Sequence, residues 1–143
     1  MIKKLLRKEG GFTLLELLIV IVIIGILALL IIPNITSAPK KARDTQRKTD
    51  LRAIQKGLEE YFVSNNVYPN QLSDLTTGTT PIMKAIPTDP KNASPNTYDY
   101  TPANTNTTYT LNSCLENAGD NGTDVIAPVS PCTTKTFQLV NNN

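Results

Sequence analysis

The feature that most constrains this chain is an almost unbroken apolar run from Phe12 to Ile32, interrupted by one charged residue, Glu16. A helix of this length extends roughly 30 Å, enough to cross the hydrocarbon core of a bilayer. Secretory signal peptides have a shorter apolar core followed by a cleavage site of small residues. The small residues that end at Ala38 could form such a site, but Pro39 directly after them disfavours cleavage. The run therefore predicts a helix that spans a membrane.

Positive charge gathers on both sides of this run, although the formal net charge of the chain is only +2. Because lysines and arginines flank both ends, the positive-inside rule does not orient the helix. The basic stretch from Lys40 to Lys56 could contact phosphates. However, it lacks aromatic side chains for stacking and is interrupted by Asp44 and Asp50. A solvated or inter-subunit surface is therefore favoured there over nucleic-acid binding.

The composition disfavours an enzyme. The chain contains no histidine, which is the commonest acid–base residue and metal ligand in proteins. The sequence shows no nucleophile paired with a base and no glycine-rich loop for binding phosphate. A membrane-anchored binding protein remains as the least favoured alternative.

The start of the apolar run carries a family signature. GGFTLLELLIV, from Gly10 to Val20, closely resembles the type IV prepilin motif, which type IV pilins and type II secretion pseudopilins share. The resemblance implies that prepilin peptidase cuts between Gly11 and Phe12 on the cytoplasmic side and methylates the new amine of Phe12. It also implies that Glu16 pairs with the N-terminal amine of a neighbouring subunit. That ion pair would set the register between adjacent helices.

The expected organisation has four parts: a prepilin leader (1–11), a transmembrane or filament-core helix (12–33), an exposed amphipathic helix (34–64) and a small globular domain (65–143). Pro33 and Pro39 predict kinks or local melting, because proline removes a helical hydrogen bond and clashes with the preceding turn.

From Leu51 to Phe62, apolar residues recur at helical spacing, so this face is expected to pack on the globular domain. Alternating patterns predict strands over 97–101, 107–114 and 135–140, and residues 71–75 predict a short helical turn. The expected fold is α+β and type IV pilin-like, with a long N-terminal helix packed against a small antiparallel sheet.

The two cysteines, Cys114 and Cys132, predict a disulfide if this part of the chain lies in an oxidising compartment. Closing a loop of about 20 residues would stabilise the domain by about 3 kcal/mol. Two free buried thiols are the alternative.

The segment ENAGDNGTD lies between these cysteines. Asp120, Asn121 and Asp124, together with Glu116, offer the hard oxygen ligands that calcium prefers. The resemblance supports a calcium site here, because major pseudopilins carry one in their C-terminal region. The complete EF-hand pattern is absent, so an ordinary polar turn is the alternative.

Together these features predict a structural subunit that polymerises through its N-terminal helix into an extracellular type IV pilus. Its expected partners are copies of itself, other pilins, prepilin peptidase and an inner-membrane assembly platform. The precursor would cross the membrane once, with its N-terminus in the cytoplasm. The alternative is a pseudopilin of a type II secretion or competence system, located in the periplasm or cell wall.

Overall fold

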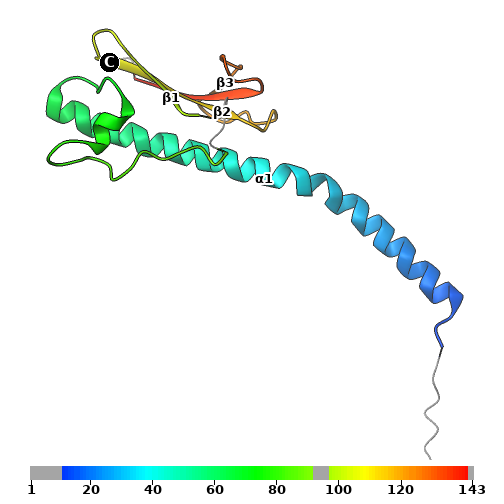
Figure 1. Cartoon of the computed structure of the whole chain (residues 1–143). Coiled ribbons are helices and arrows are strands. Elements are labelled where there is room, and N and C mark those ends of the chain that lie inside the picture. The colour runs from blue at the N-terminus through cyan, green and yellow to red at the C-terminus, as the bar shows by residue number, and fades with distance from the viewer. Residues whose placement is uncertain (1–10, 92–96, 142–143) are drawn as a thin grey trace, which may run out of the picture. The chain divides into compact units, whose positions relative to one another are not determined.

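The computed structural model describes residues 11–91 and 97–141, with side-chain surroundings for all of these except 31–36. The predicted leader thus lies outside the described residues, apart from Gly11. Within these residues the elements are one long helix, one short 3₁₀ helix and four strands: α1 (Leu14–Asn65), η1 (Leu72–Thr76), β1 (Asp99–Ala103), β2 (Thr108–Leu115), β3 (Val125–Ile126) and β4 (Lys135–Asn141). The helix packs against a small antiparallel sheet (Figure 1), so the predicted α+β fold is confirmed.

Helix α1 contains 52 residues and is helical through both Pro33 and Pro39. Neither proline therefore ends the helix, and a kink at these positions stays a prediction. By its internal contacts the chain divides into two units, Met1–Thr36 and Ser37–Asn143. The first contains the N-terminal part of α1, and the second contains the rest of α1 with the sheet.

Large apolar side chains in the first unit are exposed on every side of the helix. Phe12 is 88% exposed, Leu14 is 82% exposed, and those from Leu15 to Leu30 are 48–72% exposed. A helix that is apolar all round is normally buried, either in a membrane or among other helices. In the part of the chain that the structure describes, no helix is both long and apolar enough to cross a membrane.

The sheet has the order β1-β2-β4-β3 and is antiparallel throughout. Strands β1, β2 and β4 correspond to the three predicted strands, with bounds shifted by a residue or two. The predicted helical turn is η1. Strand β3 was not predicted, because its two residues lie in a polar loop and are too short to show alternation.

The core lies between the C-terminal half of α1 and one face of the sheet. It is formed by fully or nearly fully buried side chains of α1, β2, β4 and the segment that follows α1: Leu51, Ile54, Leu58, Tyr68, Leu75, Tyr109, Leu111, Leu115, Phe137 and Leu139. The predicted apolar face of the helix is therefore confirmed from Leu51 to Leu58, and Tyr61 and Phe62 pack against this core as partly buried side chains. A Cβ at Gly57 would lie 2.9 Å from Met83 Sδ. Because glycine has no side chain, the loop that contains Met83 can approach the helix closely here.

Candidate functional site

The N-terminal end of α1 is closed by a capping box. The Glu16 carboxylate accepts hydrogen bonds from the Thr13 backbone N–H and from Thr13 Oγ1, both at 2.9 Å. In return, Thr13 Oγ1 accepts a hydrogen bond from the Glu16 N–H at 3.2 Å. This reciprocal pattern satisfies backbone donors that the first helical turn leaves unpaired. The sequence T-x-x-E before an apolar run is the signal for such a box, so this cap could have been predicted from the sequence.

The structure places the predicted processing residues at this capped end. Gly11 and Phe12 are exposed, and they directly precede the residue that caps the helix. Glu16 is exposed as well. Its predicted pairing with the amine of a neighbouring subunit needs a second copy of the chain, so that role stays a prediction.

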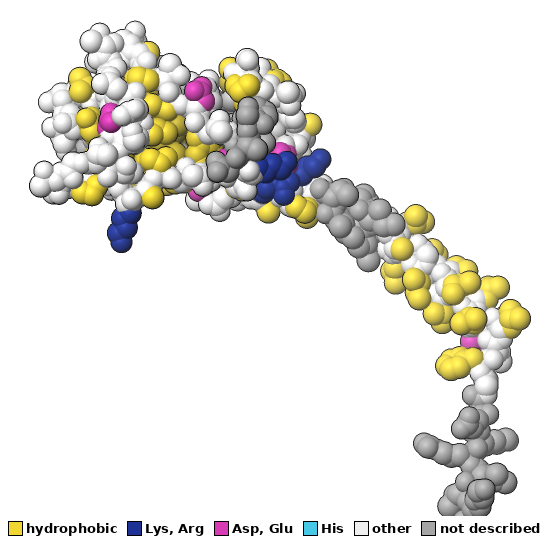
Figure 2. Space-filling view, in the orientation of Figure 1, with side chains coloured by type: hydrophobic (Ala, Val, Ile, Leu, Met, Phe, Trp, Pro, Cys, Tyr) yellow, Lys and Arg dark blue, Asp and Glu magenta, His cyan; other side chains and the backbone are white. Residues whose placement is uncertain are grey.

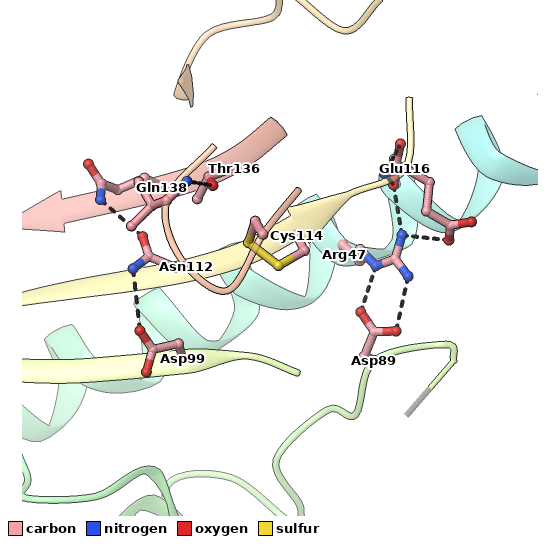
Figure 3. The surroundings of a disulfide bond; sticks show 11 residues. Arg47, Asp89, Asp99, Asn112, Cys114, Glu116, Thr136 and Gln138 are labelled. Atoms are coloured by element: carbon pink, nitrogen blue, oxygen red, sulfur yellow. Dashed lines mark hydrogen bonds and ion pairs between the residues drawn. A yellow bond between two sulfur atoms is a disulfide. The ribbon is translucent and has the colours of Figure 1, made fainter. Parts of the chain in front are cut away.

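The second unit contains a buried ion-pair cluster centred on Arg47, whose side chain is fully buried. Its guanidinium donates two hydrogen bonds to Asp89, at 2.6 and 3.0 Å. It donates further bonds to Asp44 at 2.8 Å and to Glu116 at 2.9 Å. Figure 3 shows Arg47 between Asp89 and Glu116. The planar fork of arginine suits this bidentate contact, which lysine could not make.

Glu116 and Asp44 extend the cluster to further partners. Arg43 binds both Glu116 carboxylate oxygens at 2.7 Å, and Lys91 Nζ lies 2.9 Å from Oε2 of the same side chain. The Asp44 carboxylate accepts hydrogen bonds from the backbone N–H groups of Glu116, at 3.0 Å, and Asn117, at 2.8 Å. The Arg47 cluster therefore ties α1 to the loop that contains Asp89 and to the end of β2.

The contacts of the cluster shift the pKa values of Glu116 and Arg47. The pKa of Glu116 lies well below its usual range, because Arg43 above all, and then Lys91 and Arg47, hydrogen-bond its carboxylate. Burial acts to lower the pKa of Arg47, but its bonds to Asp89, Glu116 and Asp44 outweigh this, so the pKa is raised. Glu116 and Arg47 are thus charged at neutral pH, and each has partners of opposite charge that offset its desolvation.

For Arg47 and Asp44, the structure corrects the interpretation of the basic stretch as a solvated or inter-subunit surface, whereas Lys40 and Lys41 are exposed. Arg47 and Asp44 are both buried, and Arg47 precedes Leu51 by one helical turn on the face that packs against the sheet. Extending the apolar helical spacing backward from Leu51 would have placed Arg47 inside.

A second polar site binds the C-terminal end of α1 to the sheet. Glu59 accepts hydrogen bonds from the Tyr68 hydroxyl at 3.0 Å, from the Tyr109 hydroxyl at 2.9 Å and from Asn141 Nδ2 at 3.1 Å. Burial, followed by the contact with Glu59, raises the pKa of Tyr68 to about 12.

The predicted disulfide is also present: Cys114 of β2 bonds to Cys132, with a Cα–Cα distance of 5.1 Å.

The calcium ligands predicted from the sequence point to cations of α1 instead. Asp120 Oδ2 lies 2.6 Å from Lys48 Nζ, and its Oδ1 accepts a hydrogen bond from the Gly122 N–H at 3.0 Å. Asp124 lies 3.7 Å from Arg52. The described residues contain no group of three or more histidine, cysteine, aspartate or glutamate side chains that could hold a metal ion. The geometry therefore does not support a calcium site at Asp120 and Asp124.

Comparison with known proteins gives matches to the N-terminal part of this chain and to pilin-like subunits. Residues 6–32 match the family model described as the prokaryotic N-terminal methylation motif. The chain is 38% identical over 95 residues to the type II secretion system core protein G of Vibrio cholerae, which covers 66% of this chain and 60% of that protein. It is 44% identical over 64 residues to the core protein G of Pseudomonas aeruginosa, covering 45% of each chain.

A relative from a pilus is similar to the same degree. The type IV wide pilus major component of Thermus thermophilus is 46% identical over 70 residues, which cover 49% of this chain and 53% of that protein. The chain thus spans about half the length of these relatives, or 60% for the Vibrio protein. No solved structure matches it. From its methylation motif and these relatives, the chain belongs to the family of type IV pilins and type II secretion pseudopilins.

Proposed function

We propose that this chain is the structural subunit of an extracellular type IV pilus. Prepilin peptidase would cut it between Gly11 and Phe12 and methylate the new N-terminal amine. The mature subunit would then polymerise through the apolar part of α1, together with further copies and other pilins. The methylation motif over residues 6–32 supports the processing step.

The observation that carries this proposal is the exposed apolar surface around the helix from Phe12 to Leu30. Such a surface needs cover, because exposed apolar patches larger than a few hundred Å² mark sites of interaction. We propose that a membrane covers it in the precursor and that the helices of neighbouring subunits cover it in the filament. An inner-membrane assembly platform would transfer the subunit between these states, with the precursor N-terminus in the cytoplasm.

Glu16 would fix how neighbouring helices align. A carboxylate surrounded by apolar side chains is costly unless it is paired. In the single chain, Glu16 is satisfied by Thr13 at the capped end of α1. In the filament, the methylated amine of Phe12 from the next subunit would pair with it, in only one register.

A pseudopilin of a type II secretion or competence system is the second candidate. The relatives from Vibrio cholerae and Pseudomonas aeruginosa favour it, because both are named as type II secretion core protein G. In that case the same polymer would be short and would lie in the periplasm or cell wall.

The first experiment is mass spectrometry of the N-terminal peptide from cell envelopes, followed by electron microscopy of the cell surface. A peptide that begins at a methylated Phe12, together with surface filaments that contain the chain, supports the pilus. The same peptide without surface filaments, and with loss of secretion or DNA uptake in a deletion strain, supports the pseudopilin. A peptide that begins at Met1, or a Gly11→Val variant that is processed normally, overturns both candidates.

A further inference from the structure

The part of α1 that lies in the second unit begins with unpaired positive charge. Lys40 and Lys41 are exposed, and among the described residues neither side chain forms an ion pair. Lysine and arginine side chains gather at this end of the unit (Figure 2). The neighbouring cations, Arg43 and Lys91, are already bound to Glu116. Lys40 and Lys41 therefore remain available to a partner.

The other end of the same helical segment borders a polar groove of about 400 Å³. Its walls come from the last turns of α1 and from the loop around η1. The lining contains two carboxylates and no lysine or arginine; its polar members include Glu60, Ser64, Asn65, Asp74, Thr77 and Thr80. A groove of this composition suits a cationic side chain that can donate hydrogen bonds to these oxygen atoms.

Three further features make this end of the helix suitable for a positively charged partner. Glu60 is exposed and forms no ion pair among the described residues. The nearest cation on its own helix, Lys56, precedes it by one turn and does not line the groove. The C-terminal end of a helix also carries partial negative charge. Val63, one turn beyond Glu60, is 81% exposed and would gain from being covered.

Lys40 and Lys41 cannot reach the groove of their own chain. At the usual helical rise, Lys41 and Glu60 are about 28 Å apart along the axis of one continuous helix. A lysine side chain is far shorter than this. The two complementary ends can therefore meet only between two copies, one shifted along the helix axis relative to the other.

We infer that the groove beside Glu60 and Asp74 in one copy binds Lys40 and Lys41 of the next copy along the filament. This inference rests on the proposed function, because it names a contact within the proposed polymer. The contact is head-to-tail, and such a contact generates an open helical filament when its rotation does not close a ring. A single surface ion pair contributes little to stability. Its value here is specificity, because complementary charge selects one alignment of neighbours.

Charge reversal with rescue tests the inference in filaments assembled by the full-length chain. Glu60→Lys alone, or Lys40→Glu with Lys41→Glu, is expected to abolish filaments, since each places like charges opposite one another. Combining all three changes is expected to restore filaments. Matched controls are Asp99→Lys and Lys135→Glu, which change exposed or half-exposed charges away from the groove. Normal filaments in either reversed variant, or no rescue in the combined variant, would overturn the inference.

Zero-length crosslinking of wild-type filaments gives an independent measurement. A carbodiimide joins a carboxylate to an amine only when the two are in contact. We expect a ladder of covalent oligomers on a denaturing gel and a crosslinked peptide that joins Glu60 or Asp74 to Lys40 or Lys41. Filaments that yield no such peptide, or one that joins the groove to a different protein, overturn the head-to-tail contact and leave the proposed function intact. If the wild-type chain forms no filaments at all, it is the proposed function that fails.

Discussion

The Arg47 guanidinium binds the Asp89 carboxylate through two hydrogen bonds, of 2.6 and 3.0 Å, across 42 positions of the chain. Both side chains are almost completely buried. The contact fixes the loop that precedes the sheet onto α1, in the part of the helix that carries the exposed lysines. The exposed Lys40 and Lys41 therefore lie on the same helix within two turns of a buried ion-pair cluster that ties the helix to this loop.

Replacing Arg47 by methionine is expected to destabilise the second unit strongly. The change leaves Asp44, Asp89 and Glu116 without their central cation, and removing one partner of a buried ion pair typically costs about 3–5 kcal/mol. Denaturant unfolding of the full chain in detergent, followed by tyrosine fluorescence, measures this loss. Arg52→Met is the matched control, because Arg52 is 57% exposed and lies 3.7 Å from Asp124. Equal losses in the two variants would contradict the structural role of the Arg47 cluster.

The Arg47 cluster also predicts an acid-sensitive fold. Arg43, Lys91 and Arg47 hold the folded-state pKa of Glu116 below its usual value, which is about 4.3 in an unfolded chain. Since the unfolded state binds the proton more readily, this contribution to stability is complete above about pH 5 and is lost as the pH falls toward the folded pKa. Thermal unfolding between pH 3 and pH 7 is expected to show a falling midpoint on the acid side.

Glu116→Gln tests the assignment of that acid limb. The variant is expected to be less stable at pH 7 and to lose less stability on acidification than the wild type. Glu60→Gln is the control, because Glu60 is exposed and has no ion pair among the described residues. An acid limb of unchanged slope in Glu116→Gln would assign the pH dependence to other carboxylates.

The disulfide is expected to contribute about 3 kcal/mol, since Cys114 and Cys132 are separated by 18 positions. Replacing both cysteines by alanine should lower the free energy of unfolding by this amount under oxidising conditions. When unfolding is measured in the presence of a reductant, the variant and the wild type should have the same free energy of unfolding. A difference below about 1 kcal/mol would show that the loop is already held by other contacts, such as the Lys48–Asp120 pair.

The loop between the cysteines should be independent of calcium. The Lys48 ammonium lies 2.6 Å from Asp120 and 5.7 Å from the centre of the Phe137 ring, where it balances the charge of the loop. A chelator is therefore expected to leave the melting temperature unchanged. Lys48→Met should raise amide hydrogen exchange over residues 116–124, whereas Lys56→Met, an exposed lysine of the same helix, should not. If calcium stabilised the wild type, this would instead support the calcium site that the sequence predicted at Asp120 and Asp124.

Patterns local in sequence predicted much of this fold. The apolar spacing from Leu51 gave the buried face of α1, and alternation gave β2 and β4, because both signals depend on neighbouring residues. The Arg47 cluster could not be predicted in this way, since Asp89 and Glu116 lie 42 and 69 positions from Arg47. For the same reason, the sequence could not show that Lys48 lies beside Asp120 in the loop where it predicted calcium ligands. Ion pairs between distant segments depend on the completed fold.

Glu16 has two roles that one pair of variants can separate: it caps α1 through Thr13, and it is proposed to pair with the amine of a neighbouring subunit. Glutamine at this position can still complete a capping box but carries no charge, whereas alanine provides neither. If the ion pair sets the register, both Glu16→Gln and Glu16→Ala should be processed after Gly11 and yet fail to form normal filaments. If the cap alone matters, Glu16→Gln should assemble as the wild type does. Electron microscopy of sheared filaments, with the N-terminal peptide mass as the control for processing, decides between them.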